Sequence, residues 1–445
     1  MAAFLLLIQT ALAGFAKAPY LQHPADSSIV VRWETQELAP GRVVYGLSTA
    51  CEQEVVQPDT TIDHELTLPG LVPDTLYYYR AISGPDTSTT AAFRSRRLPG
   101  TGFRFIVFGD PHGDSTTNQR VADRMAQVNP EPAFVTSTGD LTGNGRSASW
   151  RVFFNNQRPL LCRAPLFSAP GNHDYDSIAN WFRFMAQPGN ELYFTVRTGN
   201  AAFHCLDVYQ QFTPGSVQYN WLLGELEQDS ADADIRHIFV LAHTPPYTTN
   251  TVYSGNSLIQ EHLCPLFERF GVRLFFSGHV HAYEHSLVNG VHYITTGGGG
   301  ATLATSWNQA RPWTVYREAT YEFLVVDIDG ETVISRGVRP DGSEFDTLVL
   351  VSTGVAEAPR RLRGEPALFC TPNPFRASAV ISLPSAAPAM VRIYDSSGRL
   401  APFAVEPGPT PDRIVVRSLN CIPGAYFCVV EAGVRRTVLP LLLLP

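Results

Sequence analysis

The spacing of hydrophobic and polar residues changes along the chain, and this change divides the sequence into parts. Residues 15–97 carry short runs in which apolar and polar positions alternate, separated by turn-forming residues. Such alternation is typical of antiparallel strands and predicts a small β-sandwich. Strands are expected over residues 28–33, 42–45, 66–68, 76–80 and 91–94.

From residue 103 onward, apolar strands alternate with amphipathic helices, which is the pattern of a layered α/β domain. Strands are expected over residues 103–108, 133–137, 166–168, 237–241, 272–276 and 292–295. Apolar residues at helical spacing predict helices over 216–228 and 257–270, the second ending at Gly271. We place this domain at residues 103–352.

A linker rich in arginine and proline follows at residues 353–364, and residues 365–445 have strand character throughout. The chain has 445 residues, more than one hydrophobic core usually supports. The sequence therefore predicts a multidomain protein, with a β-sandwich, an α/β domain and a small C-terminal β-sandwich in that order.

Composition and charge exclude several classes of protein. Hydrophobic residues make up 44% of the chain, and no run of 18 apolar residues occurs, which argues against a disordered chain and against a membrane-spanning helix. The net charge of -8 is spread over 41 acidic and 33 basic residues. Because no basic stripe stands out, we expect no binding to nucleic acid.

The first residues form a short apolar stretch that ends in Ala11-Leu12-Ala13, a cleavage pattern typical of secretory signals. Residues 1–13 are therefore expected to be a signal peptide. No lysine or arginine precedes the stretch and Gln9 interrupts it, so an N-terminal strand is the alternative. The seven cysteines form no CxxC pair, and their connectivity is left open.

Polar clusters close five of the expected strands, at the edge where open α/β sheets place their ligands. The clusters are Gly109-Asp110-Pro111-His112, Gly139-Asp140, Gly171-Asn172-His173-Asp174, His243 and Gly278-His279-Val280-His281. In extended backbone, residues two apart point to the same side, so Asp110 with His112, and His279 with His281, can each face one cavity. This arrangement suits two metal ions about 3.5–4 Å apart.

In order and spacing, these clusters resemble the calcineurin-like metallophosphoesterases, and the preceding sandwich makes the purple acid phosphatases the nearest branch. The resemblance implies a four-layer α/β/β/α domain and seven metal ligands. These are Asp110, His112 and His281 on one ion, Asn172, His243 and His279 on the other, and Asp140 bridging the two. It further implies that His173 protonates the leaving oxygen or stabilises the phosphoryl charge, with Asp174 orienting its ring.

The sequence departs from the purple acid phosphatase pattern at two positions. A tyrosine that binds ferric iron in that branch is replaced here by Gly143, and His112 fills the ligand position used by the wider family. His285 stands where many relatives have arginine. It is expected either to contact substrate or simply to pack.

The flanking regions carry resemblances of their own. The segment Leu71–Tyr77, with Trp33 as core aromatic, resembles the tyrosine corner of fibronectin type III domains. Residues 365–445, with Asn373-Pro374-Phe375 and the run Gly424–Phe427, resemble the C-terminal sorting domains of type IX secretion substrates. This second resemblance implies delivery through a secretion machinery, so a secreted or cell-surface bacterial protein is expected.

The expected activity is that of a metal-dependent phosphoric ester hydrolase, similar to acid phosphatases and acting on a small phosphorylated substrate. Two divalent or mixed-valence ions of iron, manganese or zinc would supply the hydroxide that attacks phosphate monoesters, with His173 as acid or charge stabiliser. A phosphodiesterase with the same metal core, and a surface binding protein with a relict enzyme domain, are the alternatives. The sequence leaves substrate identity and oligomeric state open.

Overall fold

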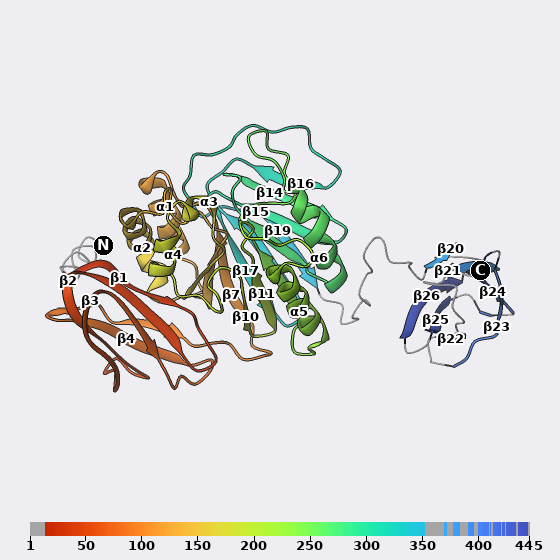
Figure 1. Ribbon diagram of the computed structural model, residues 1–445, viewed down its shortest axis with the longest axis horizontal. Coiled ribbons are helices and arrows are strands. Elements are labelled where there is room, and N and C mark those ends of the chain that lie inside the picture. Colours follow the sequence, from red (N-terminus) through yellow and green to blue (C-terminus); the bar gives the residue numbers. More distant parts are fainter. Residues whose placement is uncertain are drawn as a thin grey trace. The chain divides into compact units, whose positions relative to one another are not determined.

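The computed structural model describes residues 14–351 without a gap. Beyond residue 351 it describes residues 369–371, 377–382, 390–395, 399–408, 410, 413–419, 421–422, 424–432 and 435–443. The expected signal peptide (1–13) and the expected linker (353–364) lie outside the described residues. The chain divides into two compact units, residues 1–359 and 360–445, which are described separately (Figure 1).

The N-terminal strands surround a core of their own. They are β1 (Phe15–Gln22), β2 (Ile29–Gly46), β3 (Gln53–Leu68), β4 (Leu76–Ser83), β5 (Asp86–Thr87) and β6 (Ala91–Arg94). Trp33 is buried in this core, where its ring stacks on His64. The Tyr77 hydroxyl accepts a hydrogen bond from the Val72 N–H at 2.9 Å, as a tyrosine corner requires. The relation to fibronectin type III domains stays a prediction.

Strand β2 is continuous where the sequence predicted two separate strands. Its pairing with β3 shifts register between Glu34 and Gly41, and such irregularities bend a strand without ending it. The first part of β2 pairs with β1 and the second part with β4. Gln22 of β1 also pairs with Leu166 of β9 (Leu166–Ser168), so the N-terminal strands extend a sheet of the α/β region.

Two sheets organise the first unit. The larger has the strand order β19-β18-β17-β7-β8-β9-β1-β2-β4-β5, with β3 beside β2 and β6 beside β4. Its members from the α/β region are β7 (Phe103–Phe108), β8 (Phe134–Ser137), β9, β17 (Phe323–Asp329), β18 (Thr332–Val338) and β19 (Glu344–Val351). The second sheet contains β10 (Phe194–Thr198), β11 (Ala201–Cys205), β12 (His237–Leu241), β13 (Leu274–Ser277), β15 (Val291–Thr296), β14 (Tyr283–Val288) and β16 (Thr314–Glu318), in that spatial order.

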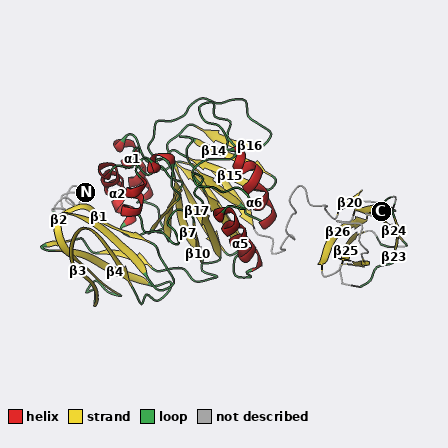
Figure 2. Cartoon of the chain, in the orientation of Figure 1, coloured by secondary structure: helices red, strands yellow, loops and turns green. Residues whose placement is uncertain are grey.

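Helices cover the outer faces of these sheets (Figure 2). They are α1 (Ser115–Met125), α2 (Ser147–Leu161), α3 (Asn172–Tyr175), α4 (Ile178–Phe184), α5 (Val217–Ala231) and α6 (Cys264–Phe270). A π-helical turn, Ile259–Leu263, precedes α6, so the helix expected over 257–270 is not α-helical throughout.

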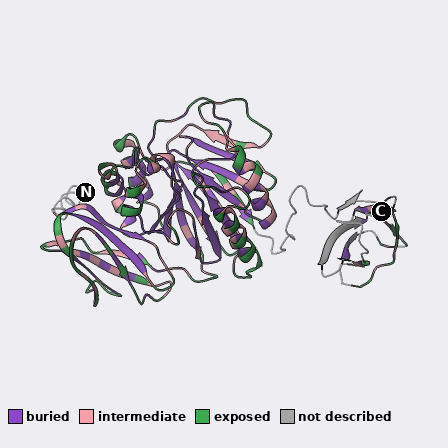
Figure 3. Cartoon of the chain, viewed as in Figure 1, coloured by how far each residue is buried: buried purple, intermediate pink, exposed green. Residues whose placement is uncertain are grey.

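An aromatic core holds the two sheets face to face. Phe203 of β11 lies 5.0 Å, between ring centroids, from both Phe105 of β7 and Phe134 of β8. Trp150 of α2 belongs to the apolar cluster on one outer face, and Phe267 of α6 to the cluster on the other. The central strands β7, β8, β11, β12 and β13 are almost entirely buried (Figure 3). This is the α/β/β/α layering that was expected.

Parallel pairing brings the ends of several strands to one edge. Strands β7, β8 and β9 are parallel to one another, and so are β11, β12, β13 and β15. The C-terminal ends of parallel strands lie at the same edge of a sheet, where loops can converge on a site. The polar clusters of the sequence follow β7, β8, β9, β12 and β13.

The second unit contains two sheets with a shared core. One has the order β20 (Phe369–Thr371), β21 (Ser378–Ser382), β24 (Arg413–Ser418) and β23 (Phe403–Pro407), and the other β22 (Met390–Asp395), β25 (Gly424–Ala432) and β26 (Arg435–Leu443). Ile381, Ile393 and Val416 are buried between them. The sorting role stays a prediction. Among the described helices of the chain, none has the length and apolar character needed to cross a membrane.

Candidate metal centre

The backbone turns sharply where it delivers the acidic clusters. Asp110, Asp140 and His279 have φ angles of 54°, 51° and 67°, a left-handed conformation that residues other than glycine rarely adopt. Gly139 precedes Asp140 with φ of 104°, and a Cβ there would lie 2.8 Å from the Gly171 nitrogen. Only glycine fits this close approach. Strain of this kind concentrates at functional sites.

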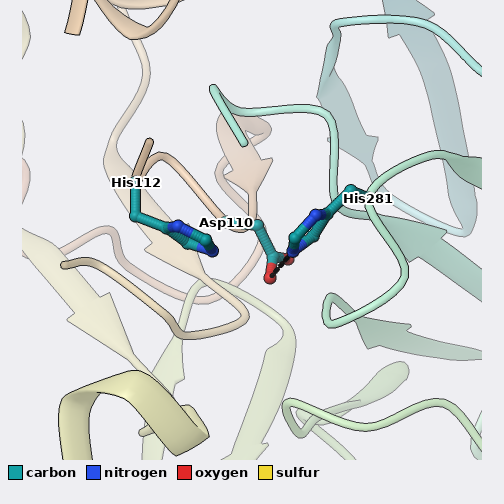
Figure 4. A group of neighbouring side chains, drawn as sticks. All are labelled: Asp110, His112 and His281. Atoms are coloured by element: carbon teal, nitrogen blue, oxygen red, sulfur yellow. Dashed lines mark ion pairs between the residues drawn. The ribbon is translucent and has the colours of Figure 1, made fainter. Parts of the chain in front are cut away.

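Asp110, His112 and His281 form the first group of candidate ligands, shown in Figure 4. Their ligand atoms lie within 4.8 Å of one another, and His281 Nε2 is 3.6 Å from Asp110 Oδ1. His281 Nδ1 donates to the Thr302 carbonyl at 3.0 Å, which leaves Nε2 as the atom that faces the carboxylate. The sequence predicted this trio on one ion.

Asp140 lies between this group and His243. His243 Nε2 is 3.3 Å from Asp140 Oδ2, and His112 Nε2 is 3.8 Å from the same oxygen. His243 Nδ1 donates to the Thr138 carbonyl at 2.9 Å, so its Nε2 is directed to the carboxylate. Asp110, Asp140 and His243 form a second group of candidate ligands. A central Asp140 is the geometry that a bridging ligand requires.

His279 and Asn172 lie at the margin of the second group. The His279 ring is 5.0 Å from the His243 ring between centroids, and the Asn172 amide oxygen accepts from the Tyr209 hydroxyl at 3.2 Å. His279 belongs to none of the compact groups of three His, Cys, Asp or Glu ligands among the described residues. It lies beside His243, and Asn172 contacts Tyr209, whose ring is 6.1 Å from the His243 ring between centroids.

The site passes a direct test of whether its residues fit metal ions. Asp110 Oδ1 and His112 Nε2 are buried, and neither has a hydrogen-bond partner in the described part of the chain. Buried polar atoms are normally satisfied, because leaving one unpaired costs about 1–3 kcal/mol. Mixed carboxylate and imidazole donors suit iron, manganese and zinc. The donor set therefore fits bound cations.

Protonation states support the same interpretation. Burial lowers the pKa of both His112 and His279 to about 4, so each imidazole is neutral at pH 7. Although burial acts against it, the Asp140 carboxylate raises the pKa of His243 to about 9, so the His243 imidazole carries a proton at neutral pH in the absence of a cation. Metal binding would displace that proton, since only unprotonated ligands coordinate.

His173 lies at the open side of the cluster. Its backbone N–H donates to Asp140 Oδ1 at 2.8 Å, and its ring is 5.0 Å from the His112 ring between centroids. The side chain is 38% exposed, and Nδ1 lies 3.4 Å from Asp176 Oδ2. The imidazole can therefore reach a substrate that enters from solvent.

Asp174 does not orient the His173 ring, contrary to expectation. As the third residue of α3, its carboxylate turns back and accepts from the N–H groups of Gly171, Leu141 and Thr142, at 3.0, 3.4 and 3.3 Å. Asp174 thus ties the loop after β8 to the start of α3. The partner of His173 is Asp176, which the sequence analysis missed because an exposed acidic residue at the end of a short helix carries no distinctive pattern.

The structure shows the surroundings of Gly143 and His285, the two positions that depart from the family pattern. A Cβ at Gly143 would lie 3.6 Å from His112 Nδ1, so a side chain at position 143 would meet the His112 ring. His285 is buried, with Nδ1 2.8 Å from Asp346 Oδ2 and Nε2 2.8 Å from His292 Nδ1. Of the two expectations for His285, packing is the one the structure shows.

Two tyrosines at the site were not anticipated. The Tyr253 ring packs 4.8 Å from His279 between centroids, and its hydroxyl is 3.5 Å from His281 Nδ1. Tyr209 donates to Asn172. Both lie in irregular loops, after β12 and β11, where periodicity gives no signal. Their position in loops that follow strands of the second sheet is the only clue the sequence offers.

Comparison with known proteins defines the class. Residues 103–283 match the family model of the calcineurin-like phosphoesterases. Purple acid phosphatase 18 of Arabidopsis thaliana is 28% identical over 335 residues, covering 66% of this chain and 74% of the relative. Probable purple acid phosphatase 20 of the same plant is 26% identical over 333 residues, covering 65% and 76%. Purple acid phosphatase PPD1 of yellow lupin (Lupinus luteus) shares the fold, with a TM-score of 0.65 at 19% identity over 75% of this chain and 74% of that one.

The fold is thus a metallophosphoesterase fold like that of the purple acid phosphatases. The purple acid phosphatase homologues and the calcineurin-like phosphoesterase domain support a metal-dependent phosphoesterase. Such a fold implies a dimetal centre, and the described residues include candidate metal ligands.

Proposed function

We propose that the protein is an exported phosphomonoesterase whose two metal ions are held by the seven predicted ligands. The observation that supports this most strongly is that two buried ligand atoms beside the central Asp140, Asp110 Oδ1 and His112 Nε2, have no hydrogen-bond partner among the described residues. A cluster built only for stability would satisfy these atoms with hydrogen bonds. Iron, manganese and zinc are the candidate ions.

Bound ions would supply positive charge for the phosphate oxygens and an ionised water at neutral pH. His173 donates a proton to the departing alkoxide, or stabilises its charge, from the exposed side of the cluster. Asp176 lies beside His173 Nδ1, which favours a ring whose Nε2 faces the substrate.

The test is hydrolysis by the full chain reconstituted with manganese, zinc or iron. A chromogenic phosphate monoester should be turned over faster than the corresponding diester, as the proposed phosphomonoesterase function requires. Faster turnover of the diester would assign a phosphodiesterase. Absence of turnover with every metal would favour the alternative of a surface binding protein.

Export and surface delivery form a separate part of the proposal. The apolar residues 1–13 support export, and the second unit, with its own β-sheet core, supports a sorting role for residues 365–445 through a secretion machinery. Fractionation of the native host would test both. Signal-peptide removal with recovery at the cell surface or in the medium is the expected result, and a cytoplasmic full-length chain would contradict it.

A further inference from the structure

A polar cavity of about 440 Å³ adjoins the metal centre on the His112 side. This volume is within the range of about 300–1,000 Å³ that small-ligand pockets occupy. The start of α1 and the first turns of α2 form two of its walls, and Gly143 lies at its edge beside the His112 ring. Because position 143 has no side chain, the cavity opens toward the metal ligands.

The walls of this cavity can donate and accept hydrogen bonds but carry no permanent charge. Its polar lining includes Ser115, Asn118, Asn144, Ser149 and Asn156. Apart from His112, no titratable side chain lines it among residues 111–156, all of which are described. A second phosphate or a carboxylate placed there would lose its hydration without gaining a cation, which is costly.

Hydrogen-bonding capacity remains available in the cavity. Asn144 Oδ1 accepts from the Ser149 hydroxyl at 2.9 Å, while the Asn144 amide nitrogen has no partner among the described residues. Asn156 Nδ2 donates to Asn118 Oδ1 at 2.9 Å. No described residue donates a hydrogen bond to the Asn156 amide oxygen. The half-exposed Val152 and the buried Phe153 supply apolar contact beside these amides. A ligand with several hydroxyl groups on a carbon skeleton could hydrogen-bond to the amides and make apolar contact with Val152 and Phe153.

The cavity lies next to the residue proposed to serve the leaving oxygen. The His112 ring, which lines the cavity, is 5.0 Å from the His173 ring between centroids. A leaving group held at His173 is therefore close enough for its remaining atoms to enter the cavity.

We infer that this cavity binds the leaving group of the substrate, and that the preferred leaving group is an uncharged alcohol with several hydroxyl groups, such as a monosaccharide. The inference rests on the proposed phosphomonoesterase function. Esters of anionic alcohols are poor substrates, because no lysine or arginine stands in the cavity to receive the second negative charge.

A matched pair of substrates tests the inference with the metal-reconstituted full chain. Glucose 6-phosphate and 6-phosphogluconate differ chiefly in that the second carries a carboxylate. We expect kcat/KM for glucose 6-phosphate to exceed that for 6-phosphogluconate by about tenfold or more. Methyl phosphate, whose leaving group is too small to reach the walls, reports the chemistry of the metal centre alone.

Two variants on α2 provide the structural test. Ser149→Phe narrows the cavity and should lower the ratio of kcat/KM for glucose 6-phosphate over methyl phosphate by about tenfold, the effect of one or two lost hydrogen bonds. Val152→Trp fills the cavity from another position and should act in the same direction. Ala148→Phe adds the same ring at an exposed, neighbouring position that does not line the cavity, and should leave the ratio unchanged.

The outcomes separate the two proposals. If methyl phosphate and all other esters resist hydrolysis, the phosphomonoesterase function itself is wrong. If methyl phosphate is hydrolysed but 6-phosphogluconate equals or exceeds glucose 6-phosphate, only the leaving-group inference is wrong. An unchanged ratio in both folded cavity variants would also overturn it.

Discussion

Asp110, Asp140 and His279 hold left-handed backbone angles that cost about 1–3 kcal/mol each in residues other than glycine. Hydrogen bonds from neighbouring loops keep these angles in place, including His279 N–H to Asp110 Oδ2 at 2.8 Å and His173 N–H to Asp140 Oδ1 at 2.8 Å. Strain, unpaired ligand atoms and neutral imidazoles thus coincide in one cluster. Each of these features lowers stability, so a cluster that served only packing would not be expected to combine them. A functional site explains the combination.

The sequence predicted most residues of the metal-ligand cluster, but not the residue that pairs with the His173 ring. Glycine before each acidic ligand and the HxH pair are local patterns, so Asp110, Asp140 and His281 could be found without a structure. The partner of His173 could not, because which carboxylate meets a ring depends on how α3 turns. The resemblance to the calcineurin-like metallophosphoesterases suggested Asp174, while the fold uses Asp176.

Replacing His173 by alanine should lower kcat by about two to four orders of magnitude, as expected for loss of a positioned proton donor. The His173 ring forms a further group of candidate ligands with His112 and Asp140, but metal content should not change, because seven other residues are the proposed ligands. Steady-state kinetics and metal analysis check both statements. His262→Ala, which alters a histidine outside the cluster, is the control and should keep wild-type kcat. Metal loss in His173→Ala would show that His173 is a ligand instead.

Among the elements, the glycine-rich loop after β15 has the clearest supporting role. Its Gly299 N–H donates to the Gly109 carbonyl at 2.9 Å, and Ala301 N–H donates to the Asp110 carbonyl at 3.0 Å. Glu322, just before β17, anchors the loop by accepting from Thr296 Oγ1 at 2.8 Å and from Gly298 N–H at 3.1 Å. These hydrogen bonds from the loop hold the backbone of Asp110, a candidate metal ligand, in place.

Burial raises the pKa of Glu322 to about 8. The folded state therefore retains a proton that the unfolded state releases near pH 4.5, and stability falls as pH rises between these values, by at most about 1.4 kcal/mol per pH unit. Glu322→Gln keeps the hydrogen-bond acceptor and removes the titration. The Tm of this variant relative to wild type should increase from pH 5 to pH 8.

The exposed Glu227→Gln on α5 is the control for this measurement and should show no such trend. A Tm difference between Glu322→Gln and wild type that stays constant with pH would mean that Glu322 is ionised in the folded protein.

Elements were predicted well where periodicity reports burial directly. The strands at 103–108 and 237–241 occur with the expected bounds, and Gly271 ends α6 in a left-handed conformation. The prediction was wrong for β2, which passes through a register shift without ending. The helix expected over 257–270 occurs with those bounds, but its residues 259–263 form a π-helical turn. Both features depend on pairing and packing with distant residues, which a local pattern does not report.

The whole molecule consists of two compact units, and every candidate ligand belongs to the first. The N-terminal strands share a sheet with the α/β region, so they are expected to be needed for folding. The second unit has a hydrophobic core of its own, and domains of this kind usually keep their stability when separated.

Deletion of residues 365–445 should therefore leave kcat/KM of the purified protein within about twofold of wild type, because no proposed catalytic group is removed. In the native host, the same deletion should prevent delivery to the cell surface. Kinetics and cell fractionation on the same variant check the two statements. Loss of folded protein would show that the second unit is integral to the enzyme, and normal delivery would remove its sorting role.

Metal content of the purified full chain, measured by elemental mass spectrometry in wild type and Asp140→Asn, tests the central claim most directly. Asp140 lies between the two groups of ligands, so neutralising it removes the negative charge that two cations would share. We predict two ions per chain in wild type, and loss of metal together with loss of phosphate monoester hydrolysis in Asp140→Asn. A wild-type chain that binds no metal, or an Asp140→Asn variant that keeps both metal and activity, would contradict the account.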